Sequence, residues 1–251
     1  VCIVDIVRTL GRISEELFGE ETARIEIVMS MGLLPLFLLS TFVYGDYIGL
    51  FFGIHAIAVV IGFLKENKWQ KILQASFWFA GGVAIKNNIN VLVIAAIIAL
   101  ILYAVINRKY WVLIWTAGLG LMAQMGLDII MWIYELRMGQ PVPDGIPKIA
   151  WITMSMQETV EGGSASGWYN GYNCSVFADN GYDQKATIAA CMVELKERFQ
   201  YFLHHPGYML YFFFDKFSSQ WNEPTFMSIQ TNEWYSRNCE PQSNLAISLL
   251  Y

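Results

Sequence analysis

The first half of the chain alternates between long apolar stretches and short polar ones. Each apolar stretch approaches the length of about 20 residues that a helix needs to cross a bilayer. The predicted spans run over residues 25–43, 47–64, 72–85, 89–106 and 111–134. Residues 1–19 resemble the end of a further helix, so we expect about five transmembrane helices and a truncated one.

The pattern changes after Tyr134, where charged residues are spread as in a water-facing domain. Residues 183–203 form an amphipathic helical pattern, and the aromatic run after it is too short to span and suits an interfacial helix. The sequence therefore predicts an all-α polytopic membrane protein. It has a transmembrane region over 1–134 and a mostly helical domain with interfacial helices over 135–251.

Short basic loops set the predicted orientation. Residues 65–71 and 107–110 are rich in Lys and Arg, and arginines flank the polar loop at 14–24. The positive-inside rule places these three loops in the cytoplasm. The turns near Asp46 and Lys86, and all residues after about 134, are then predicted to be extracytoplasmic.

Composition supports a membrane protein and excludes one class of partner. Of the residues, 55% are hydrophobic and 15% are charged, against about a quarter charged in soluble domains. The net charge of -5 and the absence of a basic patch argue against nucleic-acid binding. The cysteines lack metal-ligand spacing and are interpreted as free thiols, or as one disulfide among Cys174, Cys191 and Cys239.

Lys86 stands between two apolar segments, followed by Asn87 and Asn88. The helix before it would span about 21 Å, against a hydrocarbon core of about 30 Å. Lys86 is therefore expected below the outer surface. It either extends to the headgroups or meets an anion of the outer leaflet, such as a lipid phosphate.

Other polar side chains in the apolar segments have two interpretations each. Asp46 is a helix N-cap or a functional carboxylate. Asp128 extends to the surface or pairs with a neighbouring helix, and His55 is either a hydrogen-bonded core residue or a functional one. His204 and His205 suit a helix end better than a metal site, because no third ligand is in view.

Aromatic and amide side chains in the second half are of the type that binds sugars. Rings stack on the apolar faces of pyranoses, and amides hydrogen-bond the hydroxyl groups. The candidates are Trp168, Tyr169, Asn170, Trp221 and Asn222. A membrane-interface belt of aromatic residues explains the same composition.

Several stretches resemble a known family. They are "LFGEETARIEIVMSMGLLPLFLLSTFVYGDYIGLFFGIHAIAV", "KNNINVLVIAAIIAL", "GWYNGYN" and "ERFQYFLHHPGYMLYFFFDKFSSQWNEPTF". The chain is similar to bacterial integral-membrane glycosyltransferases of the GT-C superfamily, which are relatives of protein O-mannosyltransferases and aminoarabinose transferases. The resemblance implies transfer of a sugar from a polyprenyl-phosphate carrier to a glycan or protein acceptor. The expected place is the outer face of the bacterial cytoplasmic membrane, with a divalent metal ion assisting.

The resemblance also suggests roles for individual residues. Asp46 matches an outer-loop acidic position, and Lys86 matches a basic position that meets the carrier phosphate. Arg198 and Lys216 are further candidates for the phosphate, or solvated positions on helix faces. The main catalytic carboxylate of the family lies in a first outer loop, which this sequence, interpreted as a fragment, is expected to lack; the metal ligands are unknown.

Other classes stay open on the sequence alone. The chain could be a transporter, a lipid-carrier flippase or a noncatalytic membrane scaffold. A transporter would favour internal repeats and broken helices at the midplane. The sequence shows no repeat, and the large domain after a single run of spans favours chemistry at the outer face.

Overall fold

The computed structural model describes residues 2–38, 45–158, 166–222, 225, 227–229 and 233. Every regular element in these ranges is a helix, as the apolar pattern predicts. The chain divides into two compact units. The first unit is Val1–Pro141 with Ser228–Tyr251, and the second unit is Val142–Met227.

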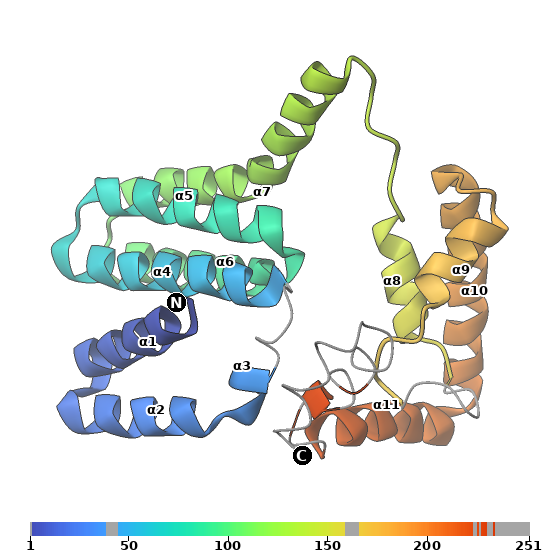
Figure 1. Cartoon of the computed structure of the whole chain (residues 1–251), viewed down its shortest axis with the longest axis horizontal. Coiled ribbons are helices and arrows are strands. Elements are labelled where there is room, and N and C mark those ends of the chain that lie inside the picture. Colours follow the sequence, from blue (N-terminus) through green and yellow to red (C-terminus); the bar gives the residue numbers. More distant parts are fainter. Residues whose placement is uncertain are drawn as a thin grey trace. The chain divides into compact units, whose positions relative to one another are not determined.

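Four helices form the bundle of the first unit (Figure 1). They are α4 (Gly45–Glu66), α5 (Trp69–Ile85), α6 (Asn90–Ile106) and α7 (Trp111–Met138). A short 3-10 turn, η2 (Asn87–Ile89), joins α5 to α6. Because the connections are only a few residues long, successive helices run antiparallel. Their common core includes the fully buried side chains of Phe63, Ile72, Phe79, Leu100 and Leu119.

Three stretches of this bundle are long and apolar enough to cross a membrane: α4, η2 with α6, and α7. They confirm the positions of three predicted spans, although α7 continues beyond the predicted end at Tyr134 to Met138. α5 begins at Trp69 rather than at the predicted Ile72, and has 17 residues. The all-α membrane architecture is confirmed.

The predicted span over residues 25–43 is not one helix. α2 (Glu20–Gly32) ends before Leu33, and α3 (Leu34–Leu38) starts after it; residues 39–44 lie outside the described ranges. Pro35 explains the break, because proline has no N–H for the carbonyl four residues earlier and is tolerated only in the first turn of a helix, where α3 places it.

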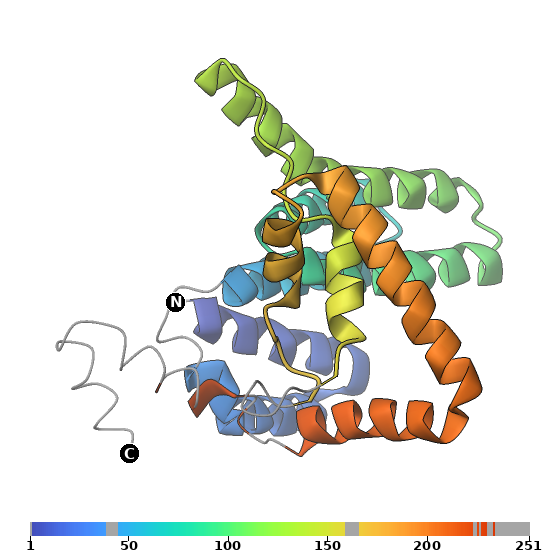
Figure 2. The same cartoon turned by 90° about the vertical axis from the view of Figure 1, so that its right-hand side faces the viewer.

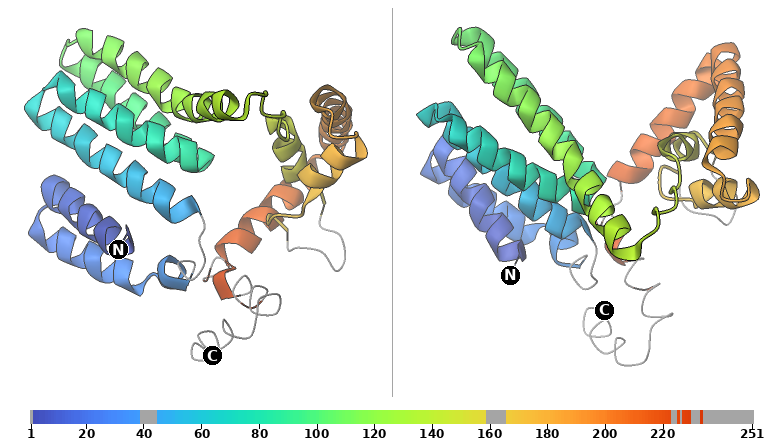
Figure 3. Two further views of the ribbon diagram at one scale, coloured as in Figure 1. Left: turned by 45° about the horizontal axis from the view of Figure 1, so that its top comes forward. Right: turned by 90° about the horizontal axis from the view of Figure 1, so that it is seen from above.

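The expected polar loop at 14–24 is also wrong, because helix continues almost through it. α1 (Cys2–Phe18) and α2 are separated only by Gly19, whose φ of 93° favours glycine. Figures 1 and 3 show α1 lying between α2 and α4. Lys65 of α4 pairs with Glu16 at the end of α1, with Nζ and Oε2 3.2 Å apart.

Small residues allow close helix contacts inside the bundle. A Cβ added to Gly126 of α7 would lie 2.5 Å from the main-chain oxygen of Ala80 in α5. Glycine at this position therefore permits an approach that no other residue allows, as is common where membrane helices pack.

The second unit contains α8 (Lys148–Ser155), α9 (Tyr172–Asp179), α10 (Gln184–His204) and α11 (Pro206–Trp221). The predicted helix over 183–203 is confirmed as α10, and its N-cap Asp183 accepts a hydrogen bond from the N–H of Ala186 at 2.6 Å. Figure 2 shows the sharp corner between α10 and α11. Pro206 at the first position of α11 accounts for the corner.

α8, α9 and α10 enclose a small core. It contains Ala150, Val176 and the thiol of Cys191. Cys191 is buried and Cys174 is exposed, and both are free. Neither forms the predicted alternative of a disulfide within the described part of the chain, and Cys239 lies outside it.

Candidate functional site

The structure brings Asp46 and Lys86 together at one end of the bundle. Lys86 Nζ lies 2.9 Å from Asp46 Oδ2, with side chains 25% and 42% exposed respectively. Asp46 belongs to the first turn of α4, and Lys86 is the residue that ends α5. Two residues that the sequence singled out separately thus form one ion pair.

Local backbone geometry places Lys86 at this position. Its own N–H donates to the carbonyl of Gly82 at 2.8 Å, and its carbonyl accepts from the N–H of Ile89 at 3.1 Å. Lys86 itself is extended, with φ of −145° and ψ of 113°, so the chain leaves α5 and enters η2 through it. The main chain of Lys86 is therefore fixed on both sides.

Glycines of α4 let this turn come close. A Cβ added to Gly45 would lie 3.3 Å from the carbonyl oxygen of Ile85, and one added to Gly49 would lie 2.9 Å from Lys86 Cβ. Any larger residue at Gly49 would press on the Lys86 side chain. The first turn of α4 and the end of α5 are thus packed directly against each other.

Helix dipoles favour the placement of both charges. A carboxylate is stabilised near a helix N-terminus and an ammonium near a C-terminus. Asp46 lies in the first turn of α4, and Lys86 lies at the C-terminal end of α5. Because α4 and α5 are antiparallel, these two ends meet at the same end of the bundle.

Hydrogen bonds between side-chain amides connect η2, the turn after Lys86, to α7. Asn90 Nδ2 donates to Asn87 Oδ1 at 2.7 Å, and Gln124 Nε2 donates to Asn90 Oδ1 at 2.6 Å. The sequence analysis noted Asn87 as a neighbour of Lys86 but missed Asn90 and Gln124. Asn90 and Gln124 could have been singled out from the sequence, because each is a polar amide in an otherwise apolar helix.

The opposite end of the bundle is basic and internally paired. Lys71 and Lys68 bind Glu66 at 2.6 and 2.9 Å. Lys109 Nζ donates to the hydroxyl of Tyr103 at 3.2 Å. The basic loops predicted to share one side of the membrane therefore share one end of the bundle, away from Asp46 and Lys86.

The other polar residues of the spans have different roles. His55 is a hydrogen-bonded core residue, because its Nδ1 lies 2.8 Å from the Phe51 carbonyl and its Nε2 lies 3.1 Å from Asp5 Oδ2. Its ring also stacks on Trp78, with centroids 4.9 Å apart. Asp128 is exposed on α7 and makes no ion pair with any described residue.

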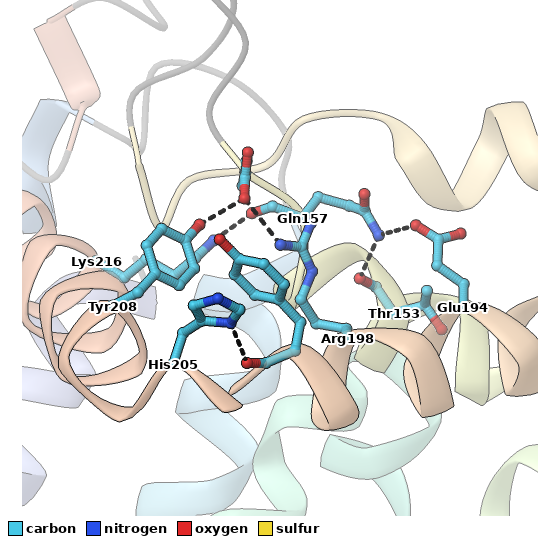
Figure 4. Close-up of polar contacts among 9 residues, drawn as sticks. Thr153, Gln157, Glu194, Arg198, His205, Tyr208 and Lys216 are labelled. Carbon is cyan, nitrogen blue, oxygen red and sulfur yellow. Dashed lines mark hydrogen bonds and ion pairs between the residues drawn. The ribbon is translucent and has the colours of Figure 1, made fainter. Parts of the chain in front are cut away.

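The second unit gathers Arg198 and Lys216 into one polar cluster (Figure 4). Arg198 Nη1 lies 2.8 Å from Glu158 Oε1, and the Tyr208 hydroxyl donates to the same oxygen at 2.5 Å. Lys216 Nζ donates to the main-chain oxygen of Gln157 at 2.9 Å. Two cations predicted on separate helices thus converge on residues 157 and 158, which the sequence analysis missed.

The environment shifts the pKa values of this cluster. Hydrogen bonds from Tyr208 and Arg198 lower the pKa of Glu158, so its carboxylate stays charged below the usual range. Burial, with Glu158 nearby, raises the pKa of Tyr208 to about 12. Burial lowers the pKa of the Lys216 ammonium. Asp215 opposes this shift, and Arg198 acts in the same direction as burial.

A second set of hydrogen bonds ties α8 and α9 to α10 beside this cluster. Gln157 Nε2 donates to Glu194 Oε1 at 2.6 Å and to the Thr153 carbonyl at 3.1 Å. The hydroxyl of Tyr172 donates to the other oxygen of Glu194. These contacts fix Gln157, and with it the carbonyl that Lys216 binds.

The predicted sugar-binding residues are only partly together. Tyr169 is 54% exposed, and its ring centroid lies 6.2 Å from that of Trp151. Asn170 donates to the Met154 carbonyl at 3.4 Å and accepts from the Tyr172 N–H at 3.1 Å, so it shapes the entry to α9. Trp168 is half-buried in the same segment.

Trp221 and Asn222 stand at the end of α11. Trp221 is 70% exposed and packs against Phe217, with ring centroids 5.8 Å apart. In the described part of the chain, no ring contact or hydrogen bond joins either residue to Trp168, Tyr169 or Asn170. The five residues therefore form two groups.

The backbone of the glycine-rich segment lies against α11. Gln220 Nε2 donates to the Gly167 carbonyl at 2.7 Å. Gly167 has φ of 85°, and an added Cβ would lie 2.8 Å from the Lys216 carbonyl oxygen. Glycine is required at this contact for both reasons.

No group of three or more His, Cys, Asp or Glu side chains within the described ranges is placed to hold a metal ion. His204 and His205 instead face the carbonyls of Gln200 and Tyr201, at 2.7 and 3.0 Å. This confirms their helix-end role. The divalent ion stays a prediction, and these residues supply no ligand set for it.

Membrane-length helices with an ion pair at one end, followed by a polar helical unit, define an integral-membrane protein with a polar site at the end of its bundle. Residues 1–132 match the family model described as dolichyl-phosphate-mannose-protein mannosyltransferase. The match covers more than half of the 251 residues, so the chain belongs to this family of GT-C type membrane glycosyltransferases.

This membership confirms the resemblance that the sequence suggested. It places the chain in the class that uses a polyprenyl-phosphate-linked sugar, and the matched region includes both Asp46 and Lys86. No curated protein and no solved structure matches the chain.

Proposed function

We propose that the protein transfers a sugar from a polyprenyl-phosphate carrier to a glycan or protein acceptor at the outer face of a bacterial cytoplasmic membrane. The Asp46–Lys86 pair carries this proposal. It is a carboxylate and an ammonium 2.9 Å apart at one end of a bundle of membrane helices, within the region that defines the family.

The chemistry needs both groups. Asp46 takes the proton of the acceptor hydroxyl as its oxygen attacks the anomeric carbon. The bond from that carbon to the carrier phosphate breaks, and the electron pair leaves with the phosphate. Lys86 stabilises the charge on the departing phosphate as a point charge.

The arrangement of charge supports the proposed outer face. The end of the bundle opposite Asp46 carries the basic loops, and basic loops face the cytoplasm in membrane proteins. Asp46 and Lys86 are thereby proposed to face outwards, where the second unit is also proposed to lie.

The second unit is proposed to contribute to substrate binding. Lys216 and Arg198 are the further cations for the carrier phosphate, and Arg198 is held by Glu158 at 2.8 Å. The sugar or acceptor is proposed to contact Trp168, Tyr169 and Asn170 in one group and Trp221 and Asn222 in the other. A divalent ion is proposed to assist, with its ligands unassigned.

The test is a transfer assay with the full-length protein in nanodiscs. Polyprenyl-phosphate hexoses labelled in the sugar are offered with a cell-envelope fraction as acceptor, and label that leaves the lipid phase is measured. The Asp46→Asn variant should transfer about 100-fold more slowly or worse, since a positioned base contributes about that much.

Asp128→Asn is the matched control, because Asp128 is also an exposed carboxylate of a bundle helix. It should keep wild-type turnover. Equal activity of the wild type and the Asp46→Asn variant would remove Asp46 from the reaction. Failure of the wild type to move label from any of the lipid-linked sugars would reject the proposed function.

A further inference from the structure

Asp46 and Lys86 bind each other in the structure, although the proposed reaction needs each of them to bind a substrate. The carboxylate oxygen that would take the acceptor's proton receives an N–H of Lys86 at 2.9 Å. The ammonium that would hold the carrier phosphate is directed at that same carboxylate. Each group thus occupies the position that a substrate would need on the other.

We propose that the carrier phosphate displaces Asp46 from Lys86, so that binding of the donor releases the carboxylate to act as a base. This inference rests on the proposed function and adds the regulation of its site. The ion pair is then the donor-free state, and the donor exchanges one anion for another on the Lys86 ammonium.

Lys86 is the member of the pair that stays in place. Its main chain is bonded in both directions, to Gly82 and Ile89, at 2.8 and 3.1 Å. Its Cβ lies against Gly49, where an added Cβ would come within 2.9 Å. The start of its side chain therefore has little room to move.

Asp46 is the member that can leave. Its side chain is 42% exposed, against 25% for Lys86. Within the described ranges it makes no other side-chain hydrogen bond or ion pair. After release it still lies in the first turn of α4, where the free N–H groups favour a negative charge.

Charge explains why the phosphate replaces the carboxylate. An ammonium has three N–H donors, so it has donors enough for both anions at once. A phosphate next to a carboxylate is a like-charge neighbour, however, and each disfavours the charged form of the other. A partly exposed ion pair changes an equilibrium by only about 1.4- to 5-fold, so the exchange has little to overcome.

The experiment measures binding of a polyprenyl monophosphate to the full-length protein in nanodiscs of zwitterionic lipid. This probe carries the phosphate without a sugar, so its binding does not depend on the identity of the sugar. Asp46→Asn should bind the probe about two- to fivefold more tightly, because a neutral amide competes less for the ammonium. The same variant should turn over more slowly, so affinity and turnover move in opposite directions.

Two further variants make the result specific. Lys86→Met should weaken binding about tenfold or more, because it removes the charge and keeps an apolar stem. Adding Asp46→Asn to the Lys86→Met variant should raise the affinity for the probe by less than it does in the wild type. In that background the carboxylate and the phosphate no longer compete for an ammonium. Asp128→Asn should leave the affinity unchanged.

The possible results distinguish failure of the anion exchange from failure of the proposed sugar transfer. If the wild type binds the probe and transfers sugar but Asp46→Asn binds equally well or more weakly, the exchange is rejected and the function stands. An equal gain in both backgrounds also rejects it, because Asp46 would then act through its charge alone. If the wild type neither binds the probe nor transfers sugar, the proposed function fails as well.

Discussion

Replacing Gly49 by alanine tests whether the close contact between α4 and the Lys86 turn matters. The added Cβ would lie 2.9 Å from Lys86 Cβ and 3.2 Å from Ile89 Cγ1. The optimal separation between non-bonded carbon atoms is about 3.5–4.0 Å. The turn must therefore move away from α4 by about 0.6 Å or more. The neighbour is the first carbon of a side chain whose backbone is fixed, so the movement has to be shared by the backbone.

The expected cost follows from two opposing terms. Alanine is favoured over glycine inside a helix by about 1 kcal/mol. Overpacking a close contact costs about 1–3 kcal/mol. The net change for Gly49→Ala is therefore a loss of about 0–2 kcal/mol in stability. A movement of the turn would also lengthen the Lys86–Asp46 contact beyond its 2.9 Å.

Gly118→Ala provides the control. Gly118 is also inside a helix of the bundle, α7, and an added Cβ there meets nothing within 4 Å. This variant should gain about 1 kcal/mol from helix propensity alone. The two variants thus differ in packing and share the propensity term, which leaves about 1–3 kcal/mol between them.

Thermal unfolding in detergent and affinity for polyprenyl monophosphate are the two measurements. Gly49→Ala should unfold at a lower temperature than Gly118→Ala. Its longer Lys86–Asp46 contact should also let it bind the probe more tightly than the wild type does. If both variants are equally stabilised and the affinity is unchanged, the turn is not constrained by α4 as the geometry indicates.

Two further outcomes are expected. The lowered pKa of Glu158 favours the folded second unit at every pH above its ordinary value of 4.5, and this contribution is lost as the pH falls through the lowered folded value. The protection factors of the α10 amides, which correct for the intrinsic pH dependence of hydrogen exchange, should therefore fall in that acidic range for the wild type, and Glu158→Gln should flatten this dependence. In a background with the native cysteines replaced by serine, Asp179→Cys should react with an impermeant maleimide in intact cells and Lys68→Cys should not, whereas the reverse pattern would overturn the proposed orientation.

The sequence predicted helices well wherever a single physical signal decided them. Asp183 marked the start of α10 through its side-chain cap, and the apolar runs marked α4, α6 and α7. The prediction of one span over residues 25–43 was wrong, because the segment is largely apolar but contains Pro35. The missing N–H of proline interrupts the helix there, whatever the hydrophobicity of the segment.

The site was predictable as residues but not as contacts. Placement in a turn singled out Asp46, and depth in the membrane singled out Lys86, yet their pairing depends on how closely α4 and α5 approach. Glu158 carried no local signal, since its partners lie 40 and 50 residues away in α10 and α11. Gln124 meets Asn90 across 34 residues for the same reason.

The attachment of residues 158 and 167 to α10 and α11 affects how these two helices hold their corner. Glu158 is held by Arg198 and Tyr208, and Gly167 is held by Gln220. Glu158 bonds to α10 through Arg198 and to α11 through Tyr208, so a single carboxylate joins the two helices on either side of Pro206. Any change in the angle between α10 and α11 would therefore have to break at least one of these two bonds.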